Sequence, residues 1–324
     1  MRAVLCKQFG PPESLVIEDV PSPVATEGKV VVSVKAAAVN FPDTLIIQNK
    51  YQHKPPMPFS PGGDLAGVVK EVGPGVTGFK PGDRVMAFLT WGAFAEEVPV
   101  ASAALAHLPD KVPFDLGASF GMTHSTSYYA LKQCGRLGPG QTLLVLGASG
   151  GVGMAAVELG KLMGARVIAC ASTAEKLEAC RKSGADELIN YETENLRERL
   201  KELVGEKGVD VCYDPVGGKY AEPALRSMAW EGRYLVVGFA SGEIPKIALN
   251  LALIKGCFIM GIRRGQFMLR RPKDSAENIR ELLQWIAEGR LKPVISARYP
   301  LERAGDAIND LANRRIIGKA VLEI

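Results

Sequence analysis

Residues Gln141 to Met163 read Q-T-L-L-V-L-G-A-S-G-G-V-G-M-A-A-V-E-L-G-K-L-M and contain a strand, a glycine-rich turn and a helix in succession. The apolar run Leu143 to Leu146 is typical of a strand buried in a parallel sheet. The next residues, Ala148 to Gly153, fit the alanine-first form of the dinucleotide-binding fingerprint, whose small residues permit a tight turn and close packing of helix on strand. This succession predicts a dinucleotide-binding βαβ unit.

The helix that begins at this turn predicts a site for phosphate oxygens. Its first N–H groups have no partners within the helix, and they lie at the positive end of the helix dipole. We therefore expect Ser149, Gly150, Gly151 and Val152 to bind the pyrophosphate of a dinucleotide cofactor. A glycine turn without a function is the alternative, and the flanking strand and helix argue against it.

The length and composition are those of an ordinary globular protein with about two domains. The chain has 324 residues, of which 47% are hydrophobic and 23% are charged. A chain of this length buries roughly 75% of its unfolded surface, and no apolar run approaches the ~18 residues that a membrane-spanning helix needs. The first ten residues read as a strand and lack the features of a secretory signal. We therefore expect a cytoplasmic protein that does not enter a membrane.

The charge distribution gives no support to nucleic-acid binding. The net charge is +4, and most basic residues are dispersed or stand beside glutamates in helices. One local basic cluster, Arg263-Arg264 with Arg270-Arg271, is interpreted as a solvated surface, with a partner site as the alternative. The six cysteines are too far apart for a Cys-x-x-Cys metal or redox motif, so we expect reduced, mostly buried thiols.

Residues 1 to about 108 predict a β-barrel-like domain. Six segments have the composition of strands, and turn signals such as Gly73-Pro74-Gly75 separate them. A short helix is expected at Phe41 to Gln48, followed by a proline-rich loop from Asn49 to Gly63. The expected strands are Ala3 to Cys6, Leu15 to Val20, Val30 to Ala38, Leu65 to Val72, Arg84 to Phe88 and Ala93 to Val98.

Beyond Pro113 strands and helices alternate, as in a doubly wound α/β sheet. One helix is expected from Asp115 to Gln133, and the elements from Val294 onward return to the first domain in this interpretation. The expected domains are residues 1–118 with 265–324, and residues 119–264. The sheet strands expected after the fingerprint are Arg166 to Ala171, Glu187 to Ile189, Val209 to Tyr213, Gly232 to Val237 and Cys257 to Gly261.

Five motifs follow one another in order: A-A-A-V-N-F-P-D, P-G-G-D-L-A-G, G-V-x-x-F-K-P-G-D-R-V, L-G-A-S-G-G-V-G and D-P-V-G-G. With them the sequence resembles, essentially from end to end, the medium-chain dehydrogenase/reductase superfamily, and most closely its zinc-free quinone oxidoreductase branch. The resemblance implies a Rossmann domain with a doubly wound parallel sheet and a discontinuous GroES-like β-barrel domain. It also implies that a nicotinamide cofactor binds in a cleft between the two.

The resemblance also bears on metal binding. Zinc alcohol dehydrogenases of the superfamily bind their catalytic metal with Cys, His and Cys, and the positions that align with these ligands are Asn40, Gly63 and Met122. None of the three is an ordinary zinc ligand, so we expect no metal. The histidines have no Cys or His partner at ligand spacing and read as surface or loop residues: His53, His107 and His124, the last with a place near the cofactor as its alternative.

The second strand of the expected sheet ends without the acidic residue that would bind the ribose hydroxyls of NAD. Ser172 and Thr173 stand there instead, and Lys176 adds a positive charge, which favours a 2′-phosphate and therefore NADPH. The resemblance implies the same role for Lys176, adds Tyr191 as a phosphate contact and, by a short match, Arg314. A solvated helix residue is the alternative interpretation of Lys176.

For the nicotinamide end, the resemblance points to residues from both expected domains. It points to Asn40, Phe41 and Asp43 in the first, and to Thr126 in the second. A helix cap is the alternative role of Asp43, and a hydrogen bond to a helix carbonyl is that of Thr126; Asp64 is interpreted as structural. Backbone contacts are expected from Gly238, Phe239, Ala240 and Ser241 and from Met260, Gly261 and Ile262.

These features favour hydride transfer from NADPH to a quinone. Tyr51, in the proline-rich loop, is a candidate hydrogen-bond donor because a phenol stays protonated at neutral pH; an ordinary loop aromatic is the alternative. Asn40, Asp43 and Thr126 complete the expected catalytic set. Two other functions stay open: reduction of activated C=C bonds in enones or acyl thioesters, and non-catalytic NADPH binding. The resemblance also implies a homodimer formed through the strand near Cys257 to Gly261, which would otherwise expose an apolar sheet edge.

Overall fold

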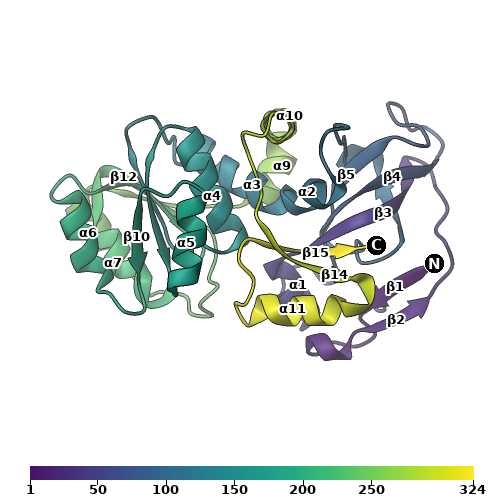
Figure 1. The fold of residues 1–324 in the computed structure, drawn as a ribbon, viewed down its shortest axis with the longest axis horizontal. Helices are drawn as coiled ribbons and strands as arrows, with labels where there is room; N and C mark the ends of the chain where they lie inside the picture. The colour runs from purple at the N-terminus through teal and green to yellow at the C-terminus, as the bar shows by residue number, and fades with distance from the viewer. The chain divides into compact units, whose positions relative to one another are not determined.

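Two large sheets organise the chain, one in each of two units, which Figure 1 traces in chain order. A separate two-stranded sheet pairs Arg2–Leu5 with Val16–Asp19 in the first unit. The computed structural model describes all 324 residues. The first unit comprises residues 1–122 and 293–324, and the second comprises residues 123–292. The second unit thus extends past the expected boundary at residue 264, because helix α10 (Pro272–Ala287) packs on it: Glu281 accepts hydrogen bonds from Tyr128 and Lys132, each at 2.6 Å.

The first unit is a mainly antiparallel sheet around the long strand β3 (Lys29–Val39). The strand order is β14-β15-β3-β4-β5-β7, with β6 also paired to β3, and only β14 and β15 run parallel. The other elements are β1 (Arg2–Leu5), η1 (Pro12–Ser14), β2 (Val16–Asp19), α1 (Phe41–Ile46), β4 (Asp64–Val72), β5 (Arg84–Phe88), β6 (Glu97–Ala101), η2 (Ser102–Ala104), β7 (Leu105–His107), α2 (Phe114–Ser119), β14 (Ile295–Pro300), η5 (Leu301–Arg303), α11 (Ala304–Ala312) and β15 (Lys319–Glu323).

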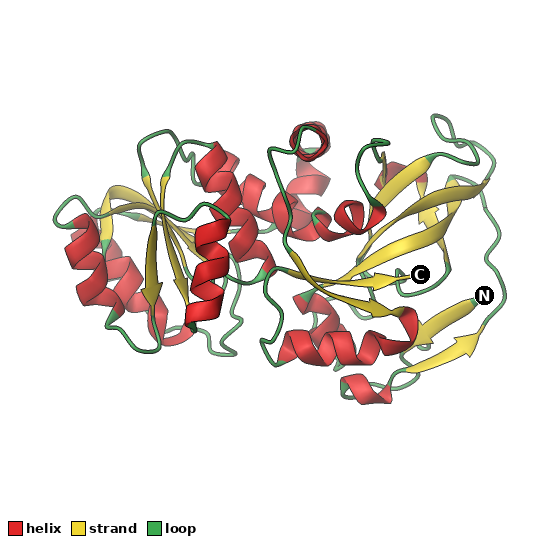
Figure 2. Ribbon diagram, in the orientation of Figure 1, coloured by secondary structure: helices red, strands yellow, loops and turns green.

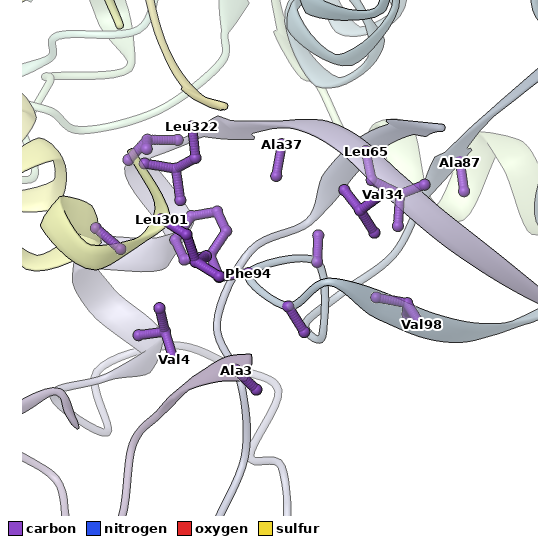
Figure 3. Packing of buried hydrophobic residues seen from close by; sticks show 14 of the residues in the cluster. Ala3, Val4, Val34, Ala37, Leu65, Ala87, Phe94, Val98, Leu301 and Leu322 are labelled. Atoms are coloured by element: carbon purple, nitrogen blue, oxygen red, sulfur yellow. The ribbon is translucent and has the colours of Figure 1, made fainter. Parts of the chain in front are cut away.

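An apolar core holds these elements together, and Figure 3 shows its packing. Phe94 is fully buried in it, between side chains from both ends of the chain such as Val4, Leu301 and Leu322. Burying a side chain of this kind contributes about 1.5 to 3 kcal/mol each. Residues 293–324 are therefore an integral part of the first unit.

The second unit contains a six-stranded parallel sheet of order β10-β9-β8-β11-β12-β13. Numbered from its first strand this is 3-2-1-4-5-6, the order of the Rossmann fold, as expected. Its elements are α3 (Gly121–Tyr128, beginning just before the unit), η3 (a π-helix, Tyr129–Cys134), β8 (Thr142–Val145), α4 (Gly151–Leu162), β9 (Arg166–Ala171), α5 (Ala174–Lys182), β10 (Glu187–Asn190), α6 (Leu196–Val204), β11 (Val209–Asp214), η4 (Gly218–Tyr220), α7 (Ala221–Arg226), β12 (Met228–Val236), α8 (Asn250–Lys255), β13 (Phe258–Gly261), α9 (Arg264–Arg270) and α10.

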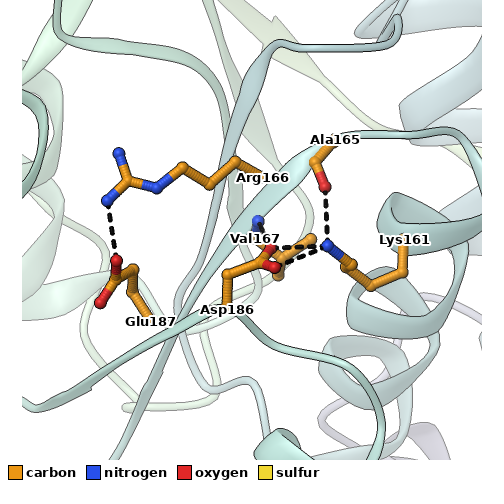
Figure 4. Close-up of polar contacts among 6 residues, drawn as sticks. All are labelled: Lys161, Ala165, Arg166, Val167, Asp186 and Glu187. Carbon is orange, nitrogen blue, oxygen red and sulfur yellow. Dashed lines mark hydrogen bonds and ion pairs between the residues drawn. The ribbon is translucent and has the colours of Figure 1, made fainter.

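Helices cover both faces of this sheet, with α4 and α5 on one side and α6 and α7 on the other (Figures 1 and 2). Polar contacts fix the register at one end, as Figure 4 shows. Asp186 pairs with Lys161 of α4 at 2.7 Å and accepts the N–H of Val167 in β9, also at 2.7 Å. Arg166 and Glu187 join β9 to β10 at 2.9 Å. Because these side chains are partly exposed, they specify alignment more than they add stability.

Several expected elements differ from the observed ones. The expected helix Asp115 to Gln133 is three pieces, α2, α3 and the π-helix η3. A side chain at Gly121 would come within 1.7 Å of the Phe88 ring, so close packing marks the first break. The expected strand Ala93 to Val98 lies further along, as β6, and the sequence analysis missed the short elements β7, α8 and α9. No helix is both long and apolar enough to cross a membrane.

Candidate functional site

Most of the predicted cofactor residues lie at one edge of the second unit's sheet. Each of five parallel strands runs into a predicted segment where it ends: β8 into the fingerprint turn, β9 into Ser172, β10 into Tyr191, β12 into the turn at Gly238, and β13 into Ile262. We call this edge the carboxyl edge. Ligands of open α/β sheets bind at this edge, so the fold brings together residues up to 113 positions apart, from Ser149 to Ile262.

The fingerprint turn has the geometry that a dinucleotide phosphate requires. Gly147 has φ +58°, a backbone conformation that favours glycine. A Cβ atom at Gly153 would lie 2.2 Å from the carbonyl oxygen of Gly147, so only glycine lets helix and strand approach this closely. Helix α4 begins at Gly151, after Gly150 in extended conformation. Its first N–H groups therefore start directly behind the turn.

A buried hydroxyl pair that the sequence analysis missed fixes the start of α4. Ser127 on α3 donates to the carbonyl oxygen of Val152 at 2.8 Å and shares a hydrogen bond of 2.8 Å with the hydroxyl of Tyr213 on β11. Both side chains are buried. The predicted residue Thr126 precedes Ser127 and is half-buried. The hydroxyl-rich segment H-S-T-S contains Ser127 and indicated hydrogen-bonding side chains. The partners of Ser127 lie 25 and 86 residues away and could not be identified from it.

Four of the five predicted phosphate residues lie at the ends of β9 and β10, whereas Arg314 belongs to the first unit. The Lys176 ammonium lies 3.4 Å from the Ser172 hydroxyl, and Thr173 caps α5 by accepting the N–H of Lys176 at 3.3 Å. The N–H of Tyr191 donates to the carbonyl oxygen of Ala171 at 3.2 Å, which brings Tyr191 beside the same strand end. An ammonium and two hydroxyls at this corner form a donor set that suits an anion.

A second missed residue, Asp214, orders the loop that binds the predicted turn from 238 to 241. Its carboxylate accepts the N–H groups of Val216 and Gly217, each at 2.8 Å, and the hydroxyl of Tyr234. The residue is buried at the end of β11. The loop that Asp214 orders then binds the predicted turn: Ala240 donates to Pro215 at 2.9 Å and Ser241 to Val216 at 3.0 Å. The sequence analysis used the motif D-P-V-G-G for the family resemblance and did not predict this structural role.

The first unit contains a buried group of polar side chains, Asn40, Asp43, Asp64 and Lys319, which we call the polar centre. The Lys319 ammonium, on β15, donates to the Asn40 amide oxygen at 2.5 Å and to the carbonyl oxygen of Val39 at 2.7 Å. The Asn40 amide nitrogen donates to Asp64 at 3.0 Å and to the carbonyl oxygen of Ala38 at 3.2 Å. The Asn40 amide therefore has partners at both its nitrogen and its oxygen within this unit.

Asp43 is a residue of the polar centre whose pKa is shifted by burial. Its carboxylate accepts the N–H of Asn40 at 2.7 Å, at the start of helix α1. Burial raises the pKa of Asp43 to about 7, although hydrogen bonds from Asn40 and Gly62 and the charge of Lys319 oppose the shift. Burial also lowers the pKa of Lys319, against the attraction of Asp64 and Asp43. The contact with Asn40 shows the helix-capping role that was the alternative for Asp43, and its part at the nicotinamide end stays a prediction.

The three positions that align with zinc ligands lie together in the first unit. The Asn40 amide and the N–H of Met122 both donate to Asp64, and a Cβ atom at Gly63 would lie 3.8 Å from the Met122 methyl group. Their donors do not suit zinc, because they are an engaged amide, no side chain and a thioether. No group of three or more His, Cys, Asp or Glu side chains is arranged to hold a metal.

The remaining predicted residues occupy varied environments. Tyr51 is half-buried against the apolar core of the first unit, with its ring centroid 5.7 Å from that of His53. Phe41, the first residue of α1, is exposed, and Arg314 follows α11 in the first unit with φ +59°. The interpretation of His124 as a surface or loop residue was wrong. It is buried on α3 and lies 2.9 Å from Glu158 of α4.

Comparisons with known proteins agree over both units. Residues 26–110 match the family model of the alcohol dehydrogenase GroES-like domain, and residues 151–288 match that of zinc-binding dehydrogenases. The chain is 38% identical to quinone oxidoreductase-like protein 2 homolog of Nematostella vectensis, over 99% of this chain and 88% of that protein. It is 34% identical to the quinone oxidoreductase of Homo sapiens, over 95% of this chain and 92% of that protein.

Solved structures give the same result for the fold. The crystal structure of Escherichia coli quinone oxidoreductase complexed with NADPH superposes with a TM-score of 0.94 at 31% identity, covering all of both chains. A probable oxidoreductase from Mycobacterium abscessus superposes with a TM-score of 0.91 at 36% identity, covering 100% of this chain and 99% of that one.

Proposed function

Because the chain belongs to the quinone oxidoreductase branch of the medium-chain dehydrogenase/reductase superfamily, we propose that it is a zinc-independent, NADPH-dependent quinone oxidoreductase. The observation that carries the proposal is the carboxyl edge of the second unit. There the fingerprint turn, the Ser172–Lys176 pair and the turn held by Asp214 follow the ends of parallel strands. The reaction would consume NADPH, a quinone and a proton and release NADP⁺ and a hydroquinone.

The residues of the carboxyl edge fit NADPH in size and charge. The glycines of the fingerprint let the start of α4 pack closely behind the turn, where its first N–H groups would bind a pyrophosphate. Ser172, Lys176 and Tyr191 would bind the 2′-phosphate, and no acid ends β9 to repel it. The turn from 238 to 241 and residues 260–262 would hold the nicotinamide. NADPH supplies a hydride from its nicotinamide, and the protein's part is to orient it and exclude water.

We assign the members of the predicted catalytic set different parts. The Asn40 amide, with partners at both polar atoms, positions the start of α1, and Asp43 braces it. Tyr51 and Thr126 remain proposed hydrogen-bond donors to the reacting carbonyl or the cofactor. A quinone needs no metal to accept a hydride, because its conjugated carbonyls spread the incoming charge. Tyr51→Phe should lower kcat about tenfold, which corresponds to about 1.4 kcal/mol, without abolishing turnover.

The experiment that tests this function is the oxidation of NADPH, followed at 340 nm. The substrates are 1,4-benzoquinone, 9,10-phenanthrenequinone and simple enones, and NADP⁺ is offered with primary and secondary alcohols in parallel. We expect turnover with the quinones that survives removal of metal by a chelator. Turnover of enones alone would favour the C=C reductase, turnover of alcohols alone would reject the proposal, and no turnover with tight NADPH binding would favour a binding protein.

We also propose that the protein forms a homodimer through β13. This strand is an edge of the parallel sheet, and Phe258 and Ile259 on it are 55% and 42% exposed. An exposed apolar edge strand is prone to pair with another chain, and pairing with its two-fold mate would cover it. Light scattering at micromolar concentration should give twice the chain mass of 34.7 kDa. A mass equal to that of one chain would contradict the proposal.

A further inference from the structure

The second unit contains a cavity of about 260 Å³ outside the segments assigned to the cofactor's phosphates. The π-helix η3 forms one wall, the end of β13 another, and α9 with the residues on either side of it the third. Side chains that line the cavity include Tyr129, Met260, Arg263, Phe267, Arg270 and Arg271. The arginines come from the basic cluster that the sequence analysis interpreted as a solvated surface. The fold therefore brings part of that cluster around one hollow.

The cavity carries a net positive charge. No residue that lines it is acidic. Arg271 has one acidic neighbour, Asp274, at the long distance of 3.9 Å, and Arg263 and Arg270 form no ion pair. Guanidinium groups present several N–H donors in a planar fork, which suits the oxygens of a carboxylate or phosphate. The three arginines are exposed and only Arg271 has a carboxylate nearby, so the hollow presents an accessible excess of positive charge to an anion.

Two aromatic side chains, one from η3 and one from α9, add apolar surface to the lining. The rings of Tyr129 and Phe267 stack with centroids 4.2 Å apart and an interplanar angle of 16°. Burial raises the pKa of Tyr129 to about 12, so its phenol is a neutral donor at physiological pH. Tyr129 begins the π-helix, an uncommon local structure that often marks functional sites. The cavity thus combines aromatic with cationic side chains.

Met260 connects this cavity to the carboxyl edge. It is the third residue of β13 and precedes Gly261 and Ile262, which the proposed function assigns to the nicotinamide end. We propose that the cavity binds the carboxylate or phosphate group of an anionic substrate whose reducible part is planar. The proposal rests on the proposed function for the identity of the ligand as substrate. It names a substrate class, anionic quinones or anionic conjugated carbonyl compounds, over their neutral analogues.

Direct binding tests the anion site without turnover. The probes are 2-naphthoate and its neutral isostere 2-naphthamide, measured by calorimetry on the wild type and on the double variant Arg263→Gln, Arg270→Gln. We expect the wild type to prefer the naphthoate, and the double variant to lose about tenfold of that affinity while its affinity for the amide is unchanged. Arg197→Gln, an exposed arginine on α6, is the control and should behave as the wild type.

Kinetics then tests whether the ligand is the substrate. The wild type and both variants are assayed with NADPH and either 9,10-phenanthrenequinone or its 2-carboxylate. We expect the ratio of kcat/KM for the carboxylate over the neutral quinone to fall about tenfold in the double variant and to stay constant in Arg197→Gln. Equal affinity of the wild type for the two naphthalene probes, or an equal loss in Arg197→Gln, would overturn the anion site.

The two experiments separate the anion site from the proposed function. If binding follows the expectation but the kcat/KM ratio does not move, the cavity is not a substrate subsite and the proposal is rejected in that form. If no quinone is reduced by any variant, the proposed function fails and the ligand is not a quinone substrate, while the calorimetry still decides whether the cavity binds anions.

Discussion

The carboxyl edge of the second unit and the polar centre of the first unit are assembled in different ways. At the carboxyl edge, neighbouring residues make many of the contacts, such as Lys176 with Ser172, four positions earlier. In the polar centre, Asn40 contacts Asp64 across 24 residues and Lys319 across 279. The first region combines a local motif with the pairing of parallel strands, and the second depends on contacts between the two ends of the chain. We therefore expect changes in the polar centre to act on folding, and changes at the carboxyl edge to act mainly on ligand binding.

The largest effect should come from Lys319→Met. This substitution leaves the Asn40 amide oxygen and the Val39 carbonyl without their buried donor and the nearby carboxylates without a cation. Breaking a buried charged network on one side costs about 3 to 5 kcal/mol, measured as the free energy of unfolding in denaturant. Lys35→Met on β3 is the control, since Lys35 is exposed and should change stability by less than about 0.5 kcal/mol. Equal stability of Lys319→Met and Lys35→Met would contradict the expectation that changes in the polar centre act on folding.

A pH dependence of stability should follow from Asp43. Its pKa is near 4 in the unfolded chain and about 7 in the folded one, so between these values only the folded chain keeps the proton. The stability that this group contributes is complete below pH 4 and is lost as the pH rises through 7, by up to roughly 4 kcal/mol. The unfolding free energy of Asp43→Asn should not show this decrease as the pH rises. A variant whose unfolding free energy falls with pH as steeply as that of the wild type would contradict the shift.

Of the two substitutions proposed at the carboxyl edge, Gly153→Ala should change stability more than Lys176→Ala. The new Cβ atom meets the Gly147 carbonyl oxygen at 2.2 Å, so α4 must move away from the turn. Overpacking of this kind costs about 1 to 3 kcal/mol, and it should also weaken NADPH binding because the N–H groups of α4 move. Gly138→Ala is the control, since its nearest neighbour would lie 4.0 Å away. Thermal unfolding measures the loss of stability, and NADPH titration measures the loss of affinity. An unchanged NADPH affinity would contradict the placement of the cofactor against the first N–H groups of α4.

Lys176→Ala should have the smallest effect on stability and a selective effect on binding. A charge-assisted hydrogen bond contributes about 1.5 to 3 kcal/mol, so NADPH should bind ten- to a hundredfold more weakly while NADH binding stays nearly constant. Because Lys176 is partly exposed, we expect the lower end of this range. Lys182→Ala, at the exposed end of α5, should change neither affinity. An equal loss for both cofactors in Lys176→Ala would mean that Lys176 does not recognise the phosphate.

The same contrast explains what the sequence could predict. The strand, turn and helix around Gly150 were predicted correctly, because apolar periodicity and small residues act over a few positions. The role of Lys319 was not predicted, because nothing in a lysine at the start of β15 indicates that strand pairing will bury it beside Asn40. His124 was misread for the same reason, since its partner Glu158 is a residue of another helix.

Packing also explains the misplaced elements. The segment from 115 to 133 has helical composition throughout, yet it is divided into three helical pieces, and the close contact of Gly121 with Phe88 that accompanies the first division cannot be read from composition. The arginine-lined cavity depends on the stacking of Tyr129 on Phe267, which are 138 positions apart.

The interleaving of the two units along the chain has a consequence for biosynthesis. The second unit is one uninterrupted segment, whereas the first needs β15, which is translated after the whole second unit and pairs with β3. Until then β3 lacks its pairing with β15, and the Asn40 amide oxygen lacks the hydrogen bond from Lys319. On the ribosome we therefore expect the Rossmann unit to fold first, while a nascent chain that stops before residue 319 exposes the unpaired side of β3 to chaperones and proteases.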